Sequence, residues 1–158
     1  MADVADWQKL ANALRELHRT LLEHARRDYE RELVVTLNPG EFLQLLTTHE
    51  DFAWLRSLSE LMVDIDLVRD AEPVDKDEIA AAVRGAVELL VAKTRDPVSL
   101  FAQHYWPYVH DDPNVAMAHA AVKQALSAWP RPPMEDAASL LHERHRLAEK
   151  ARHVSRRG

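Results

Sequence analysis

The sequence predicts an all-α protein, and three observations carry that prediction. Glycine is scarce, with 3 residues in 158, whereas strands and hairpins usually need glycine in their turns. Apolar residues recur at intervals of three and four positions, which is the helical period. A capping residue followed by proline, a helix-start signal, occurs at Asn38-Pro39, Asp96-Pro97 and Asp112-Pro113. We therefore expect a compact bundle of five to six helices.

A long N-terminal helix is expected to begin near Asp3 or Asp6, because either side chain can cap it. Its apolar stripe continues for about four heptads through Trp7, Leu10, Leu14, Leu17, Leu21, Ala25, Tyr29 and Leu33. This stripe is longer than the short helix expected after Pro39 can cover. Since a large uncovered apolar patch is a liability in a monomer, we expect a homodimer to which the first helix contributes.

The third helix is expected over residues 47–68, with Thr47 or Thr48 as its cap. Its apolar residues spread over about twice the arc of an ordinary surface helix, which predicts a central position. The centre is expected at Leu58, Leu61, Met62 and Ile65. Asp66 falls inside the same arc, so it is either exposed where the helix ends or paired with a cation.

Three further helices complete the predicted bundle. Asp75 or Lys76 opens a fourth helix with one apolar face, and Gly85 lies on the opposite face. A fifth helix runs from about Pro97 to Trp106, because Pro107 disfavours a helical conformation in the residue before it. A sixth helix runs from about residue 113 to 129, and Asp111 or Asp112 caps it at the corner between the two.

The chain divides into a bundle (residues 1–129), a Pro-rich linker (130–133) and a basic C-terminal helix (134–158). From residue 131 onward the net charge is +3, whereas residues 1–130 carry −9 within a total of −6. Attraction between opposite charges favours docking of this tail on the acidic body. A free tail that binds a partner is the alternative.

Composition narrows the classes of function. The absence of cysteine excludes disulfides, thiolate metal sites and cysteine nucleophiles. The N-terminus lacks the basic start and apolar run of a signal peptide, and no apolar run is long enough to span a bilayer, so we expect a cytoplasmic protein without a membrane partner. A glycine-rich phosphate loop and a serine nucleophile elbow are both absent. We therefore expect neither catalysis nor a bound cofactor.

The 9 histidines are nevertheless numerous for this length. The densest histidine–aromatic segment, residues 103–110, is followed by a histidine on the apolar stripe of the sixth helix. The candidate cofactor-binding residues are His104, Tyr108, His110 and His119. A small pocket with aromatic walls is one interpretation, and ordinary core packing where three helices meet is the other.

A candidate metal site lies in the C-terminal helix, where His142, His145 and Glu149 share one face. Imidazole and carboxylate are apt ligands for zinc or iron. Four basic side chains in the same segment would repel a cation, so a solvated charged face is the simpler interpretation.

The sequence thus predicts a protein-interaction or self-association module without catalysis. A small-ligand, metal or haem sensor that uses His104, His110 and His119 is the alternative. Nucleic-acid contact through the Arg-rich tail is a second alternative, against which the net charge of −6 argues.

Overall fold

The computed structural model describes residues 5–70, 76–93 and 99–132, and these ranges contain helices and no strand. The elements are α1 (Trp7–Leu33), α2 (Pro39–Thr48), the 3₁₀-helix η1 (Glu50–Leu55), α3 (Arg56–Asp70), α4 (Lys76–Leu90), α5 (Leu100–Asp111) and α6 (Pro113–Leu126). The all-α bundle is therefore confirmed. The predicted basic C-terminal helix lies outside the described residues.

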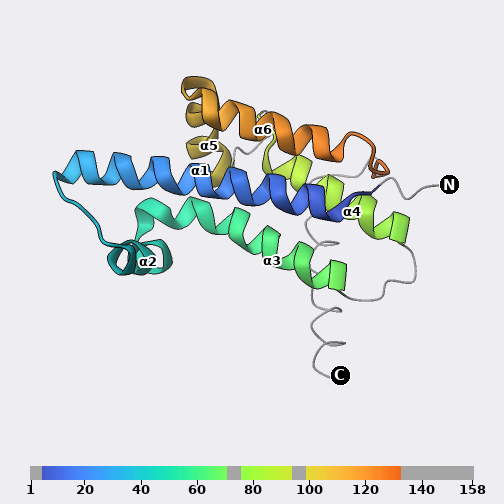
Figure 1. Cartoon of the computed structure of the whole chain (residues 1–158), viewed down its shortest axis with the longest axis horizontal. Helices are drawn as coiled ribbons and strands as arrows, with labels where there is room; N and C mark the ends of the chain where they lie inside the picture. The colour runs from blue at the N-terminus through green and yellow to red at the C-terminus, as the bar shows by residue number, and fades with distance from the viewer. Residues whose placement is uncertain (1–4, 71–75, 94–98, 133–158) are drawn as a thin grey trace, which may run out of the picture.

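Helix α1 runs along the long axis of the molecule, between α6 on one side and α3 on the other (Figure 1). Asp6 is its N-cap, and the carboxylate accepts a hydrogen bond from the backbone N–H of Lys9 at 3.0 Å. The predicted stripe is buried from Leu10 to Ala25. Since that stretch is buried within one chain, the large apolar residue of the stripe that stays strongly exposed is Leu33, at the C-terminal end of α1.

The segment between α1 and α3 differs from the prediction in its caps. Asn38 begins α2 as predicted, through a capping box with Glu41. Thr47 and Thr48 remain inside α2 and donate their hydroxyls to carbonyls of the preceding turn. His49 is the cap instead, because its Nδ1 accepts from the N–H of Asp51. The chain then makes the six-residue 3₁₀-helix η1 before α3 begins.

This 3₁₀-helix explains the environment of Asp66. A 3₁₀-helix turns about 120° per residue instead of 100°, so the apolar residues of η1 do not share the angular phase of α3. The buried face of α3 consists of Leu58, Leu61, Asp64, Ile65 and Val68. Asp66 is exposed, as one of the two expectations had it, although α3 does not end there and continues to Asp70. Met62, expected at the centre, is only partly buried.

Helix α4 is more deeply buried than the single apolar face predicted. Every residue from 80 to 87 is buried, and Gly85 is among them. Five of these residues are alanine or glycine, and such small side chains let other segments of the same chain pack closely around α4. The central position predicted for the third helix is therefore shared by α4.

Helix α5 continues through Pro107, which corrects the predicted end at Trp106. It begins after Ser99, whose hydroxyl accepts from the N–H of Ala102, whereas the predicted start at Asp96-Pro97 lies outside the described residues. Tertiary contacts hold both sides of the proline: Tyr105 is fully buried, and Tyr108 donates a hydrogen bond to α1. These contacts offset the roughly 3 kcal/mol that an internal proline costs a helix.

Helix α6 begins as predicted and closes the bundle. Asp112 is its N-cap and accepts from the N–H groups of Asn114 and Val115. At the other end, the Trp129 ring lies 4.8 Å from the Trp7 ring, and its carbonyl accepts from the buried Arg84 at 2.6 Å. Trp129 is therefore held by contacts to α1 and α4, whereas the bundle limit predicted at this residue stays a prediction.

Replacing Asp112 with alanine should lower the free energy of unfolding by about 0.5–2 kcal/mol, the usual effect of losing an N-cap. The loss removes an acceptor for two backbone N–H groups and a partner of His24 at 3.3 Å. Chemical denaturation measures the change. Asp111→Ala is the matched control, because Asp111 is exposed and, within the described ranges, pairs only with the exposed His110. Equal losses in both variants would contradict the assignment of the cap.

Candidate functional site

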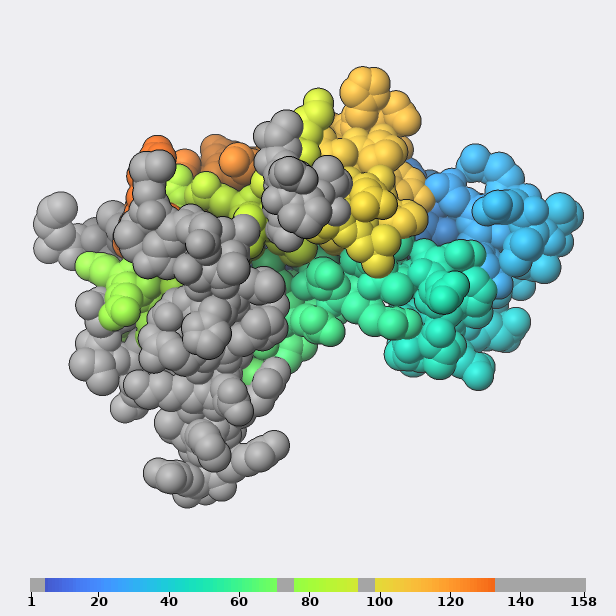
Figure 2. Space-filling view, turned by 180° about the vertical axis from the view of Figure 1, so that it is seen from behind, coloured from blue at the N-terminus to red at the C-terminus, as the bar shows by residue number. Residues whose placement is uncertain are grey.

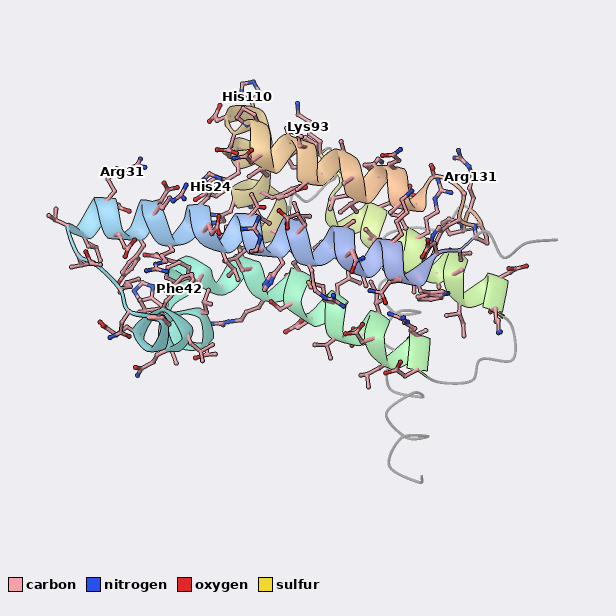
Figure 3. All side chains as sticks on the ribbon, viewed as in Figure 1. His24, Arg31, Phe42, Lys93, His110 and Arg131 are labelled. Carbon is pink, nitrogen blue, oxygen red and sulfur yellow. The ribbon has the colours of Figure 1, made fainter. Side chains whose placement is uncertain are left out.

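The structure separates the four candidate cofactor-binding residues into three environments. His104 and Tyr108 both stack on Trp54, with ring centroids 5.3 and 6.0 Å away. His110 projects from the end of α5 (Figure 3) and pairs with Asp111 in solvent. His119 contacts the opposite side of α5. The three histidines proposed for a sensor therefore do not line one pocket.

His119 takes part in helix packing between α5 and α6. Its Nδ1 lies 2.6 Å from the hydroxyl of Tyr105, and its ring makes an edge contact with Trp106 at 5.1 Å. Burial, and secondarily Lys123, lowers the pKa of His119, whereas burial raises the pKa of Tyr105. A neutral tyrosine and a neutral imidazole thus share a hydrogen bond that joins two helices.

The other described histidines also have partners that stabilise the fold. His18 of α1 lies 3.0 Å from the hydroxyl of Ser59 in α3, and His24 of α1 pairs with Asp112 at the start of α6. His49 caps η1. Among the described residues, no group of three histidines and carboxylates could hold a metal ion. The candidate metal ligands His142, His145 and Glu149 lie outside these residues.

His104 and Tyr108 do line a cavity of about 310 Å³ between α1, η1 and α5. We call it the acidic cavity, because Asp28, Glu32 and Asp51 contribute carboxylates to it; its other lining residues are Ala25, Tyr29, Phe52, Trp54, His104 and Tyr108. No lysine or arginine is among these lining residues. The sequence pointed to the α5 side of this cavity and missed the acids of α1 and η1.

One hydrogen bond organises the rim of the acidic cavity. The hydroxyl of Tyr108 donates a hydrogen bond to Oδ2 of Asp28, with 2.5 Å between the two oxygens. Burial, and then the bond to Asp28, raises the pKa of Tyr108, so its hydroxyl stays a neutral donor. The bond fixes the ring against Trp54 and ties α5 to α1. The cavity wall is therefore built before any ligand arrives.

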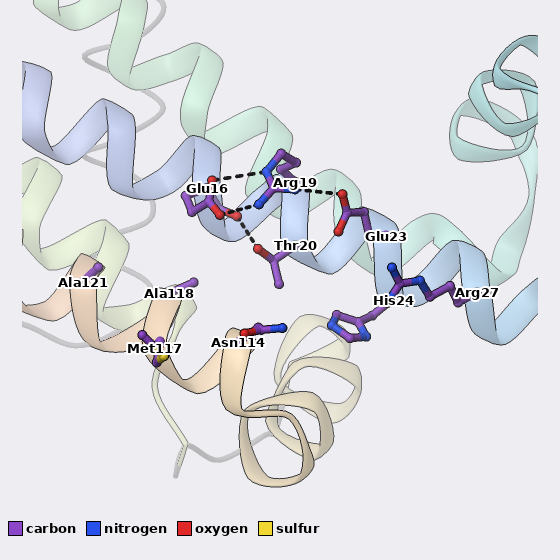
Figure 4. Close-up of a pocket in the computed structure, with 10 residues that line it drawn as sticks. All are labelled: Glu16, Arg19, Thr20, Glu23, His24, Arg27, Asn114, Met117, Ala118 and Ala121. Atoms are coloured by element: carbon purple, nitrogen blue, oxygen red, sulfur yellow. Dashed lines mark hydrogen bonds and ion pairs between the residues drawn. The ribbon is translucent and has the colours of Figure 1, made fainter.

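A second cavity, of about 450 Å³, lies between α1 and α6 (Figure 4). Three of its charged groups already pair with one another, because Arg19 binds Glu16 at 2.5 Å and Glu23 at 2.8 Å. Thr20 donates its hydroxyl to the carbonyl of Glu16. Met117 is 71 % exposed and is the one large apolar side chain of this lining. The second cavity is therefore lined mainly by polar side chains, several of which already bond to one another.

The largest of the described cavities is a groove of about 660 Å³ where α1 ends and α2 begins. We call this region the end surface: the run Leu33–Val35 and the groove, lined by Tyr29, Leu33, Val35, Thr36, Leu37, Glu41, Gln44, Leu45 and Thr48. Seven large apolar residues of the described chain are strongly exposed, and three of them are Leu33, Val34 and Val35. Figure 2 shows the end of α1 and α2 projecting from the body.

Val34 has an unusual backbone conformation on the end surface. It is 89 % exposed, and its φ of 54° places it in the left-handed region. This C-cap position normally carries glycine, and a β-branched residue with positive φ is a genuine outlier. Val34 therefore destabilises the fold locally and contributes almost no burial in return.

Polar contacts hold the connection between α1 and α2 in place. Arg26 donates to the carbonyl of Leu37 at 2.8 Å, and Glu30 accepts from the N–H of Leu37 at 2.7 Å. Arg26 and Glu30 also pair with each other at 3.6 Å, and Leu37 is buried. The groove beside this connection is accordingly a preformed feature, because its wall is anchored to α1.

Comparison of the chain with protein-family models, with curated proteins and with solved structures finds no match in any of the three. Within the described ranges, none of the helices combines the length and the apolar character needed to cross a bilayer.

Stability should fall as the pH drops below about 6.5, because His18 and His119 resist protonation in the folded state. Burial lowers the pKa of both imidazoles below the ordinary value of 6.5. At lower pH the unfolded chain therefore binds more protons than the folded chain. The two neutral histidines contribute fully to stability above pH 6.5, and this contribution is lost as the pH falls through their lowered pKa values. Urea denaturation between about pH 7.5 and pH 5.5 measures the slope.

The matched comparison is the double variant His18→Gln with His119→Gln, which cannot take up those two protons. Its free energy of unfolding should change less over the same pH interval than that of the wild type. An unchanged slope would contradict the assignment of these two histidines as the source of the pH dependence.

Proposed function

We propose that the chain is a cytoplasmic protein-interaction module without catalysis, and that the end surface is where its partner binds. The observation that carries this proposal is Val34, which combines almost complete exposure with a backbone conformation that disfavours valine. Strained residues that the surrounding structure tolerates tend to mark functional positions. The cytoplasmic location is supported by the lack of cysteine, which suits a reducing compartment.

The shape of the end surface supports protein binding. Contiguous exposed apolar residues next to a groove are typical of sites that accept an amphipathic helix or a short segment. Leu33 and Val35 line the groove from α1 and the connection, and Leu45 lines it from α2. Because Arg26 and Glu30 anchor the connection, a partner would meet an ordered wall and would spend little free energy on ordering it.

The homodimer remains a prediction, and the proposal restricts the part of α1 that a second copy could contact. The part of the α1 stripe from Leu10 to Ala25 is covered within the chain, so a second copy would have to use the last turns, at Leu33. Contact with nucleic acid through the Arg-rich tail concerns residues outside the described ranges. It also stays a prediction.

Val34→Asp should abolish capture of the partner by the tagged full chain. Aspartate tolerates the left-handed conformation and removes the exposed apolar side chain, so folding should be preserved while binding is lost. Proteins retained from a cytoplasmic extract by wild type and variant are compared by mass spectrometry. Val63→Asp on α3 is the matched control, because Val63 is 53 % exposed and lies outside the end surface.

Retention of the same proteins by wild type and Val34→Asp would contradict the proposal. Sedimentation of the purified chains separates the two kinds of partner. A wild type at twice the mass of the 18.1 kDa chain, with Val34→Asp at the single mass, would identify the partner as a second copy.

A further inference from the structure

The groove of the end surface and the acidic cavity are neighbours. Tyr29 of α1 lines both of them. In the last two turns of α1, Asp28 and Glu32 face the acidic cavity, and Tyr29 and Leu33 face the groove. A segment bound in the groove would therefore lie within one side chain's reach of the acidic cavity, so the two are parts of one surface.

The acidic cavity carries an excess of negative charge. Of its three carboxylates, Asp28 has Arg31 at 3.9 Å as a distant cation, and Asp51 has His49 at 3.7 Å. Glu32 makes no ion pair within the described part of the chain. With no lysine or arginine in the lining, a cation brought by a ligand would find Glu32 unpaired among the described residues, and Asp28 and Asp51 held only by long ion pairs and, for Asp28, by the neutral hydroxyl of Tyr108.

Aromatic rings form the other wall of the acidic cavity. The His104 ring lies on Trp54 with an angle of 11° between the planes, and the Tyr108 ring lies on Trp54 at 18°. Tyr29 packs on Phe52 with centroids 5.4 Å apart. Flat π-faces beside carboxylates suit a guanidinium group, which is planar, stacks on rings and donates paired hydrogen bonds to carboxylates.

The size of the acidic cavity restricts its occupant. Pockets for small molecules span about 300–1,000 Å³, and this cavity of about 310 Å³ lies at the lower limit. That volume suits one long side chain better than a large planar cofactor. An arginine carried by a segment seated in the groove fits both the volume and the charge.

We infer that the partner of the end surface is a protein segment that places apolar side chains in the groove and an arginine in the acidic cavity. This inference rests on the proposed function and adds the chemistry of the partner. A second copy fits it less well, since Arg31, the exposed arginine nearest the end of α1, points away from α2 (Figure 3). If Val34 of one copy bound in the groove of another, Arg31 of the first copy would therefore not reach the acidic cavity of the second.

The test uses the full chain and two fluorescent helical peptides of alanine and glutamine. Each peptide carries three leucines one helical turn apart and, one turn further, either arginine or the neutral isostere citrulline. Anisotropy titration should show the arginine peptide binding at least about fivefold more tightly, as expected for a partly desolvated cation beside aromatic rings and carboxylates. Amide chemical shifts of the labelled chain should change around both Leu33 and Glu32.

The variants Glu32→Gln and Asp51→Asn should each reduce the preference for arginine and leave the affinity for the citrulline peptide unchanged. Glu50→Gln is the matched control, because it removes the same charge one residue from Asp51 and outside the cavity lining. Raising the salt concentration should reduce the preference as well.

Three results would overturn the inference. Equal binding of the two peptides, both lost in Val34→Asp, would leave the interaction function intact and exclude the arginine. A preference that survives the Glu32→Gln/Asp51→Asn double variant would place the cation elsewhere. Absence of binding by either peptide, or a stable wild-type dimer that excludes both, would show that a different occupant covers the surface.

Discussion

The packing of α1 between α6 and α3 is the constraint on which the rest of the structure depends. Leu10, Leu17 and Leu21 have no exposed surface, and burial of each leucine contributes about 1.5–3 kcal/mol. His18 and His24 add one polar contact to each neighbouring helix. Beyond Ala25, the described elements that lie beside α1 are α2, η1 and the end of α5. The acidic cavity and the groove lie there, where α6 and α3 no longer cover α1.

Local chemistry made some elements predictable. The sequence predicts Asn38 as a helix cap, and it predicts Asp6 and Asp112 each as one of two candidate caps. These predictions succeed because a cap depends on residues within one turn. The predictions were wrong where contacts between residues distant in sequence determine the course or the burial of a helix. Pro107 stays inside α5 because Tyr105 and Tyr108 are held by other helices. The apolar arc that included Asp66 assumed one continuous α-helix, whereas the 3₁₀-helix η1 turns by a different angle per residue. Helix α4 is buried on more than its apolar face.

The candidate site was predictable only in part, for the same reason. His104 and Tyr108 stand four residues apart on one helix, so their shared environment followed from the helical period. Asp28 and Asp51 reach the same cavity from two other elements, and no spacing in the chain indicates that meeting. The end surface had a local signal that was missed: three apolar residues follow one another where α1 ends, and valine occupies the position that glycine usually takes.

The most direct measurement of the central claim, that Val34 serves a partner and not the fold, is the stability of Val34→Gly. Glycine adopts the left-handed conformation without strain, so the free energy of unfolding should rise by about 1 kcal/mol even after the entropy cost of glycine, while partner capture is lost. Val35→Gly is the control, because Val34 is the one described non-glycine residue with positive φ; that change should not stabilise the chain. A Val34→Gly variant that is less stable than the wild type, or that still captures the partner, would contradict the account.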